Sequence, residues 1–202
     1  MIECLFHYFR KGFAPFQSLS GLPETEALRI MEALYVPGSV LWQRFGNPAE
    51  YIGLRRQVER DLCQQFKRIG GQPRQDFPIY LVVGRPRWVY ASVDPVTMQT
   101  TDEIRVPLAI LDEDEVSFTY PDSMYCSFMR HMNLDPGIDP KYDGKVFTLK
   151  EIEGLIISDG LPGQGWKPDL PAHLSRYIEA QVWNQEALAE YARKLDLFSK
   201  GN

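Results

Sequence analysis

The sequence lacks the features that most directly indicate chemistry. Its 202 residues include only three cysteines and three histidines. Cys4, Cys63 and Cys126 lie far apart in the sequence, so they form neither a CxxC zinc motif nor a disulfide framework. We therefore expect three free, buried thiols in a reducing compartment. The histidines show no spacing typical of metal ligands, and no metal site is predicted.

Phosphate-binding and nucleophile motifs are also missing. No GxGxxG follows an expected strand, and neither a GxxxxGK[ST] loop nor a GxSxG turn occurs. The glycines of 160–166 (GLPGQGW) are explained by a linker between a helix and a strand. The acidic run 112–115 lacks the alternating spacing of a calcium loop, so we expect a solvated turn there.

Excess positive charge and long apolar runs are absent as well. The net charge of −5 gives no general attraction to a phosphate backbone, so nucleic acid is not an expected partner. One local cluster, Arg85 and Arg87 beside Trp88, is suited to a phosphate or to a base, and a surface turn explains it equally. No apolar run is long enough to cross a membrane, and the apolar stretch at the N-terminus is too short for a signal peptide. We expect a cytoplasmic protein without a membrane partner.

The pattern that is present predicts an α+β fold. The length suits one globular domain over 1–202, and 44% hydrophobic residues supply a sizeable core. Strands are expected at 2–9, 79–83, 103–108, 116–120 and 176–183, with a further candidate at 88–93, and helices at 23–34, 47–69, 123–132, 148–158 and 184–198. This order is not a regular βαβ alternation. It favours a mixed or mostly antiparallel sheet with about four to five helices packed on it.

The clearest element is the helix predicted over 47–69. Asn47 is a suitable N-cap, Pro48 fits the first helical position, and Glu50 follows three residues after the cap. Apolar residues then recur at spacings of three and four, at Tyr51, Leu54, Val58, Leu62, Phe66 and Ile69. We expect this stripe to pack across one face of the sheet.

His7 and Glu179 are the residues that suggest a chemistry. His7 precedes Tyr8 in the first expected strand (LFHYF), and Glu179 lies in the last one (YIEAQVW). If the first strand is central, the His7 imidazole needs a hydrogen-bond partner inside the fold. A histidine on an early strand, an arginine-bearing helix and a glutamate on a late strand resemble the NAD-dependent ADP-ribosyltransferase superfamily.

The resemblance implies NAD as the nucleotide ligand. His7 would orient the NAD ribose, and Glu179 would stabilise the ribosyl cation as nicotinamide leaves. Arg55 lies beside the apolar stripe of its helix, where it would reach a pyrophosphate, and its alternative role is a pair with Glu59 one turn along. A stacking tyrosine is not singled out by the sequence, and the candidates are Tyr51, Tyr80 and Tyr120.

A second interpretation needs no catalysis. His7 is then a core histidine and Glu179 a solvent-facing strand residue. The protein would act as a non-catalytic binding or scaffold protein, through a protein partner or by self-association as a homo-oligomer. The two interpretations differ in geometry, because only the enzymatic one requires His7, Arg55 and Glu179 to share a pocket.

Overall fold

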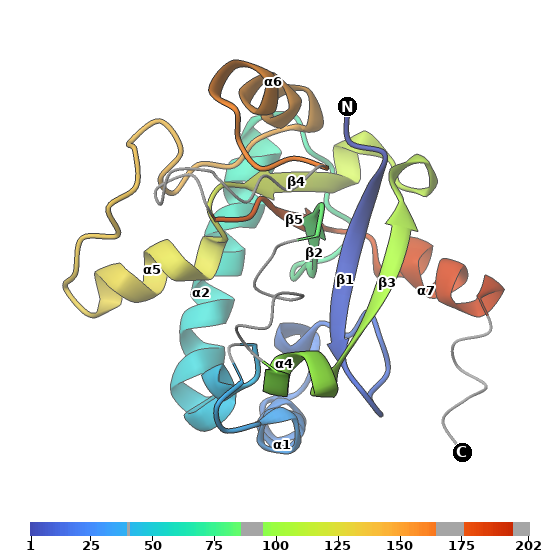
Figure 1. Ribbon diagram of the computed structural model, residues 1–202, viewed down its shortest axis with the longest axis vertical. Helices are drawn as coiled ribbons and strands as arrows, with labels where there is room; N and C mark the ends of the chain where they lie inside the picture. Colours follow the sequence, from blue (N-terminus) through green and yellow to red (C-terminus); the bar gives the residue numbers. More distant parts are fainter. Residues whose placement is uncertain (40, 86–94, 165–175, 196–202) are drawn as a thin grey trace.

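The computed structural model describes residues 1–39, 41–85, 95–164 and 176–195. An antiparallel sheet of five strands, in the order β3-β1-β2-β5-β4, forms the centre of the α+β fold (Figure 1). The strands are β1 (Cys4–Arg10), β2 (Ile79–Val83), β3 (Thr101–Pro107), β4 (Val116–Thr119) and β5 (Glu179–Val182). Each neighbouring pair is antiparallel. The candidate strand at 88–93 lies outside the described residues.

Six α-helices surround this sheet in the described ranges. They are α1 (Glu24–Leu34), α2 (Pro48–Arg68), α4 (Pro95–Thr100), α5 (Ser123–His131), α6 (Leu149–Asp159) and α7 (Gln185–Lys194). Five of them match the helices expected from the sequence, and α4 is the addition. Single 3₁₀ turns occupy Leu19–Gly21, Gln43–Gly46, Leu108–Ile110 and Glu113–Glu115. The predicted α+β class is confirmed.

Local capping explains where several helices begin. The Thr148 hydroxyl accepts from the Glu151 backbone N–H and the Glu151 carboxylate accepts from the Thr148 N–H, so the predicted capping box of α6 is present. The Asn184 side chain accepts from Ala187 at the start of α7. Pro107 ends β3 at an edge of the sheet, where a missing N–H costs no ladder bond.

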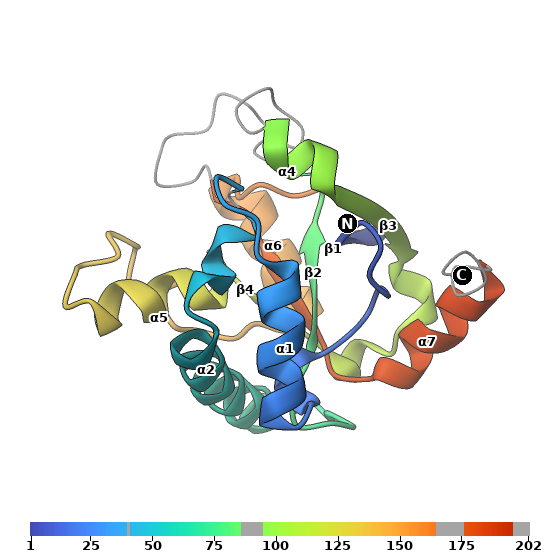
Figure 2. The same cartoon turned by 90° about the horizontal axis from the view of Figure 1, so that it is seen from below.

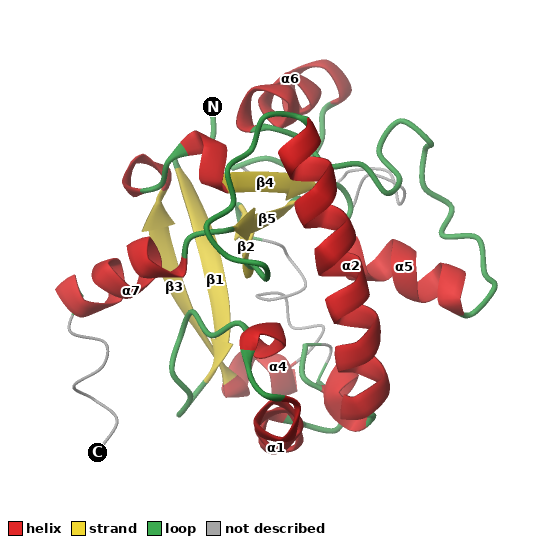
Figure 3. Ribbon diagram, turned by 180° about the vertical axis from the view of Figure 1, so that it is seen from behind, coloured by secondary structure: helices red, strands yellow, loops and turns green. Residues whose placement is uncertain are grey.

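Helices cover both faces of the sheet. Figure 2 shows α1, α2 and α5 on one side and α7 on the other, and Figure 3 shows α2 running across the first of these faces. On the second face, Ile152 of α6 and Leu188 of α7 pack with Leu81, Phe118 and Val182 in the main apolar core. We call this the apolar face of the sheet.

The face under α2 is equally buried but much more polar. Its inward side chains on the central and edge strands include Tyr80, Ser117, Thr119, Glu179 and Gln181, and all four residues of β4 and of β5 are buried. Trp183 follows β5 and stacks on Phe66 of α2. We call this the polar face. Side chains on successive strand residues point to opposite faces, so the sequences VSFT and EAQV build both faces at once.

The buried side of α2 differs from the predicted stripe in its first half. Val58, Leu62 and Phe66 are buried as expected, but Arg55 and Glu59 are buried with them, whereas Ile69 is 39% exposed. Tyr51 and Leu54 are half-buried. The helix therefore brings an ion pair to the sheet, where the Arg55 guanidinium lies over the Tyr80 ring.

Strands β1 and β2 separate soon after they pair. Their register covers Leu5 with Val83 and Phe6 with Val82, whereas β1 and β3 pair from Cys4 to Arg10. The last residues of β1 therefore leave β2 and follow β3. This fork opens the sheet between its second and third strands.

Cys4, Cys63 and Cys126 are free and buried. Glu115, expected in a solvated turn, is 3% exposed, because Arg74 and Asn184 both donate hydrogen bonds to its carboxylate. Among the described residues, no helix is long and apolar enough to cross a membrane.

Candidate functional site

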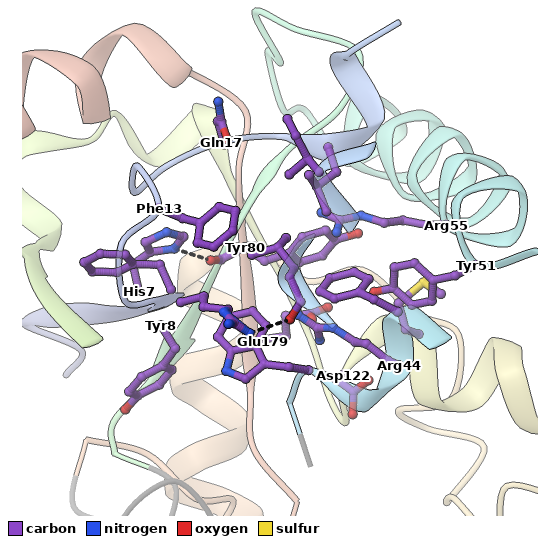
Figure 4. Close-up of a pocket in the computed structure, with 18 of the residues that line it drawn as sticks. His7, Tyr8, Phe13, Gln17, Arg44, Tyr51, Arg55, Tyr80, Asp122 and Glu179 are labelled. Atoms are coloured by element: carbon purple, nitrogen blue, oxygen red, sulfur yellow. Dashed lines mark hydrogen bonds between the residues drawn. The ribbon is translucent and has the colours of Figure 1, made fainter. Parts of the chain in front are cut away.

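A pocket lies at the fork between β1 and β2. Its walls come from the end of β1, the loop after it, α1, the turn at 42–46, α2, β2, the start of α5 and β5 (Figure 4). Its cavity volume is about 130 Å³, and the empty space among its walls, open solvent included, is about 830 Å³. His7, Arg55 and Glu179 all line it. The tertiary structure thus brings together three residues that are far apart in the sequence.

His7 fills the gap where the two strands part. Its Nδ1 lies 3.0 Å from the Tyr80 carbonyl oxygen (Figure 4), and its Nε2 accepts from the Phe16 backbone N–H at 3.0 Å. A carbonyl only accepts, so Nδ1 carries the proton and the imidazole is neutral. Burial lowers the pKa of His7 to about 4, although the bond to Tyr80 opposes the shift. Both ring nitrogens are therefore occupied by backbone groups.

His7 also holds the loop that forms one wall of the pocket. Phe16 has a φ of 57°, in the left-handed region that a residue with a side chain rarely adopts. The Phe16 ring lies 4.6 Å from the imidazole between centroids, and its N–H donates to Nε2. Phe13 and Gln17 of this loop line the pocket. The role that these contacts support for His7 is to position the loop.

Glu179 is the most strongly held side chain of the site. Its Oε2 accepts from the Ser123 hydroxyl at 2.6 Å, from the Ser123 N–H at 3.0 Å and from Gln181 Nε2 at 3.1 Å. Its Oε1 has no hydrogen-bond donor within the part of the chain that the structure describes. One oxygen thus fixes the carboxylate, and the other is left for a ligand. Glu179 is 6% exposed, so it is not a solvent-facing strand residue.

A chain of buried hydrogen bonds orients this carboxylate from behind. Trp183 Nε1 donates to Ser117 Oγ at 2.8 Å, and Ser117 Oγ donates to Gln181 Oε1 at 2.9 Å. Gln181 Nε2 then donates to Glu179 and, at 3.0 Å, to Thr119 Oγ1. The side chains of this chain satisfy one another, which is the condition for burying such a network at low cost.

The environment keeps Glu179 close to its titration point at neutral pH. Burial, with the nearby Asp122 carboxylate, raises the pKa of Glu179 to about 7, and the donors Ser123 and Gln181 oppose the shift. Burial also raises the pKa of Asp122, which caps α5 by accepting from the Tyr125 N–H. The two carboxyl groups titrate as a pair. Glu179 can therefore exchange a proton or stabilise a positive charge near neutral pH.

Arg55 reaches the pocket from α2 with its charge already balanced. Its Nε lies 2.7 Å from Glu59 Oε1, and both side chains are more than nine-tenths buried. Its guanidinium carbon lies 4.8 Å from the centroid of the Tyr80 ring. The Tyr80 hydroxyl is buried and makes no hydrogen bond of normal geometry with the described residues, although Ser123 lies close enough to oppose the rise that burial causes in its pKa. The alternative role given to Arg55, a pair with Glu59, is present in the structure.

Arg44 is the pocket residue that the sequence did not suggest. Its guanidinium carbon lies 5.9, 5.1 and 6.0 Å from the ring centroids of Trp42, Phe45 and Tyr51. The flanking rings in WQRF were the available signal, but Tyr51 belongs to the next helix. Only the tertiary fold completes this cage.

The other predicted cofactor-binding arginines stand apart from the pocket. Arg85 pairs with Glu103 and lies 5.1 Å from the Phe6 ring centroid, and it does not line the pocket. Burial and the hydrogen bond to Glu103 raise the pKa of Tyr8, which does line it. Glu103 therefore lies between Arg85 and Tyr8, the residue that lines the pocket. Arg87 lies outside the described residues.

The site offers aromatic surfaces, guanidinium groups and the carboxylates of Asp122 and Glu179, but the described residues form no metal-binding cluster. Across residues 1–39, 41–85, 95–164 and 176–195, no group of three or more His, Cys, Asp or Glu side chains is arranged to hold a metal ion. Organic ligands with a ring and an anionic group match these walls best. No family model, no curated protein and no solved structure matches this chain.

Proposed function

We propose that the pocket binds a nucleotide, with NAD as the leading ligand, and that the protein is an ADP-ribosyltransferase-like enzyme. The observation that carries this proposal is the position of Glu179. Its carboxylate is buried beside aromatic rings, held through Oε2, and has Oε1 unengaged by the described residues. A carboxylate in such a dry site stabilises a developing cation far better than one in water.

The size of the pocket limits which part of a nucleotide enters it. An engineered protein cavity of about 150 Å³ accepts benzene. The cavity here is about 130 Å³, so it has room for one aromatic ring. The ribose and the phosphates would then lie in the solvent-open space next to the cavity. We therefore place the nicotinamide ring inside and the rest of the molecule toward the mouth.

The proposed step breaks the bond between the ribose C1′ and the nicotinamide nitrogen. The electron pair leaves with nicotinamide, and the positive charge that develops on the ribosyl group faces Glu179. An acceptor nucleophile, water in the simplest case, then bonds to C1′ and loses its proton. Tyr51 and Tyr80 supply ring surface.

The decisive experiment compares Glu179→Gln with the wild-type chain. Nicotinamide release from NAD is followed by chromatography, and NAD binding by calorimetry. We expect the variant to lose at least about 100-fold in kcat, the scale of a lost electrostatic contact in a closed site. NAD binding should change less than about threefold, because glutamine keeps the shape of the side chain.

Controls separate the carboxylate from general charge effects. Glu190→Gln makes the same change on the exposed side of α7, where Glu190 pairs with Lys194, and should leave the rate unchanged. Wild-type kcat should rise with pH through about 7, because only the ionised Glu179 stabilises the cation. Equal release by wild type and Glu179→Gln, or no NAD binding at millimolar concentration, would remove the enzymatic proposal.

A second candidate function rests on a different part of the surface. Phe128, Met132 and Leu134, in and after α5, are 50%, 51% and 48% exposed. Large apolar side chains gathered in one exposed segment favour association with a protein partner or a second copy. Sedimentation velocity over a range of concentrations tests self-association, with Phe128→Ser as the comparison. If the chain stays monomeric and binds no NAD, the result supports association with a protein partner over both self-association and the NAD-dependent enzyme.

A further inference from the structure

Three arginines line the pocket, and they differ in what already engages their charge. Arg55 is neutralised by Glu59 at 2.7 Å. Arg10 donates through Nη1 to the Leu34 carbonyl at 3.2 Å and lies near the Phe13 ring. Arg44 is exposed, and it makes neither a hydrogen bond nor an ion pair with any residue in the described ranges. Arg10 keeps one buried donor, Nε, without a partner there, so Arg44 is the pocket arginine with the most donors available to a ligand.

The rings around Arg44 fix its orientation without using its donors. Trp42, Phe45 and Tyr51 lie within about 6 Å of the guanidinium carbon, the range of a cation–π contact. Phe45 is almost fully buried and meets Tyr51 edge to face at 5.3 Å, so the cage is itself packed in place. Contacts with rings engage the faces of a guanidinium, and its N–H groups stay free for bidentate binding of an oxyanion.

We propose that Arg44 binds a phosphate of the ligand, and that the pocket consequently selects a phosphorylated nucleoside over the unphosphorylated one. This inference rests on the proposed function and extends it by naming the group recognised at the mouth of the pocket. It also reassigns phosphate binding from Arg55, whose charge Glu59 balances, to Arg44. Arg44 is an exposed lining residue of the pocket, so a phosphate that remains outside the cavity can reach it.

Asp122 allows a test in the opposite direction, because its removal should strengthen phosphate binding at Arg44. It lines the same pocket, Figure 4 shows it beside Arg44, and the Arg44 charge opposes the rise in its pKa. An ionised Asp122 repels a phosphate bound at Arg44. Asp122→Asn removes that charge and keeps a residue that caps helices equally well. The variant should therefore strengthen phosphate binding without loss of α5.

The experiment measures binding of nicotinamide riboside and nicotinamide mononucleotide by calorimetry with the full chain. Wild type should bind the mononucleotide at least about tenfold more tightly, since a hydrogen-bonded charge pair contributes about 1.4 kcal/mol or more. Arg44→Gln should abolish this preference and leave riboside binding unchanged. Arg44→Lys should retain part of it, because an ammonium group lacks the planar fork. Asp122→Asn should raise mononucleotide affinity a few fold and leave the riboside unaffected.

A matched control and two distinct failures complete the test. Arg60→Gln changes the same charge on the exposed side of α2, outside the pocket, and should preserve the preference. If both ligands bind equally in wild type and Arg44→Gln, the role of Arg44 is wrong while nucleotide binding stands. If neither ligand binds at millimolar concentration, the proposed function is wrong, and the role of Arg44 with it.

Discussion

The two faces of the sheet are both buried, yet they are built from opposite chemistry. The apolar face meets α6 and α7 through side chains such as Leu81, Phe118 and Val182, each with almost no exposure. The polar face carries Glu179, Gln181 and their hydrogen-bonded neighbours, and it meets α2 where Arg55 lies over Tyr80 and Phe66 stacks on Trp183. One face supplies most of the apolar burial, and the other supplies the pocket.

The difference teaches that alternating polar and apolar residues along a strand do not always indicate a solvent-exposed face of the sheet. In VSFT and EAQV, polar and apolar residues alternate as in a sheet with one solvated side. Here α2 and α5 cover the polar side instead. The buried hydroxyl, amide and carboxylate groups then have to satisfy one another, which yields a rigid, oriented site at the expense of apolar contact.

The largest expected effect tests the apolar face. Phe118→Ala removes a fully buried ring from the main core and should lower the free energy of unfolding by about 3–5 kcal/mol in urea titrations. The wall residues of the pocket are untouched, so the folded fraction should still bind NAD. A loss below about 1 kcal/mol would show that the apolar face does not dominate stability.

A comparable loss should follow when the ion pair of the polar face is broken. Arg55→Met leaves the Glu59 carboxylate buried and unpaired, which costs about 3–5 kcal/mol of unfolding free energy. Arg55→Met combined with Glu59→Leu should recover most of that loss, because no buried charge remains. Arg60→Met on the exposed side of α2 is the control, expected within about 0.5 kcal/mol of wild type. A double variant as unstable as the single one would mean that the pair itself stabilises the fold.

Opposite pH dependences should separate His7 from Glu179. His7 has a folded pKa of about 4 against 6.5, so its contribution to stability is lost as pH falls through this window. Glu179 has a folded pKa of about 7 against 4.5, so stability is lost as pH rises through its window. Each pKa shift corresponds to about 3 kcal/mol of unfolding free energy. In wild type the two groups change this free energy with pH in opposite directions.

Single variants expose the two slopes. Unfolding free energy of Glu179→Gln should exceed that of wild type increasingly from pH 5 to pH 8, because glutamine cannot ionise. His7→Gln should instead show stability that falls with rising pH, on a lower baseline caused by the loosened Phe16 loop. Urea titrations at half-unit pH steps give both profiles. Curves that run parallel to wild type would contradict the burial of the two groups.

The smallest effect concerns the hydrogen-bond chain behind Glu179. Ser117→Ala removes the acceptor of Trp183 Nε1 and one donor to Gln181, and should cost about 1–2 kcal/mol of unfolding free energy. Ser158→Ala, an exposed serine of α6, should change stability by less than about 0.5 kcal/mol. Equal stability of the two variants would show that the buried network is replaceable.

Much of the site lies beyond what local patterns can indicate. The sequence pointed to His7, Arg55 and Glu179, but for each of them it left open whether the side chain lines a ligand pocket or has only a structural role. The actual partners of Glu179 include Ser123, 56 residues away, and the Nε2 atom of His7 is occupied by Phe16 of a loop with no recognisable motif. Arg44 was missed because Tyr51 completes its cage from a separate element.

The sequence by itself determined the approximate positions of the five described strands and of five of the six described helices. Pro48, the Thr148–Glu151 box, Asn184 and the apolar run at 79–83 act within a few residues, so their effects can be read locally. The tertiary structure alone decided that the polar face is covered, that β1 leaves β2 after Phe6, and that a pocket opens at the fork. The physical reason is that burial, and the pKa values that follow from it, depend on which distant segments exclude water from a side chain.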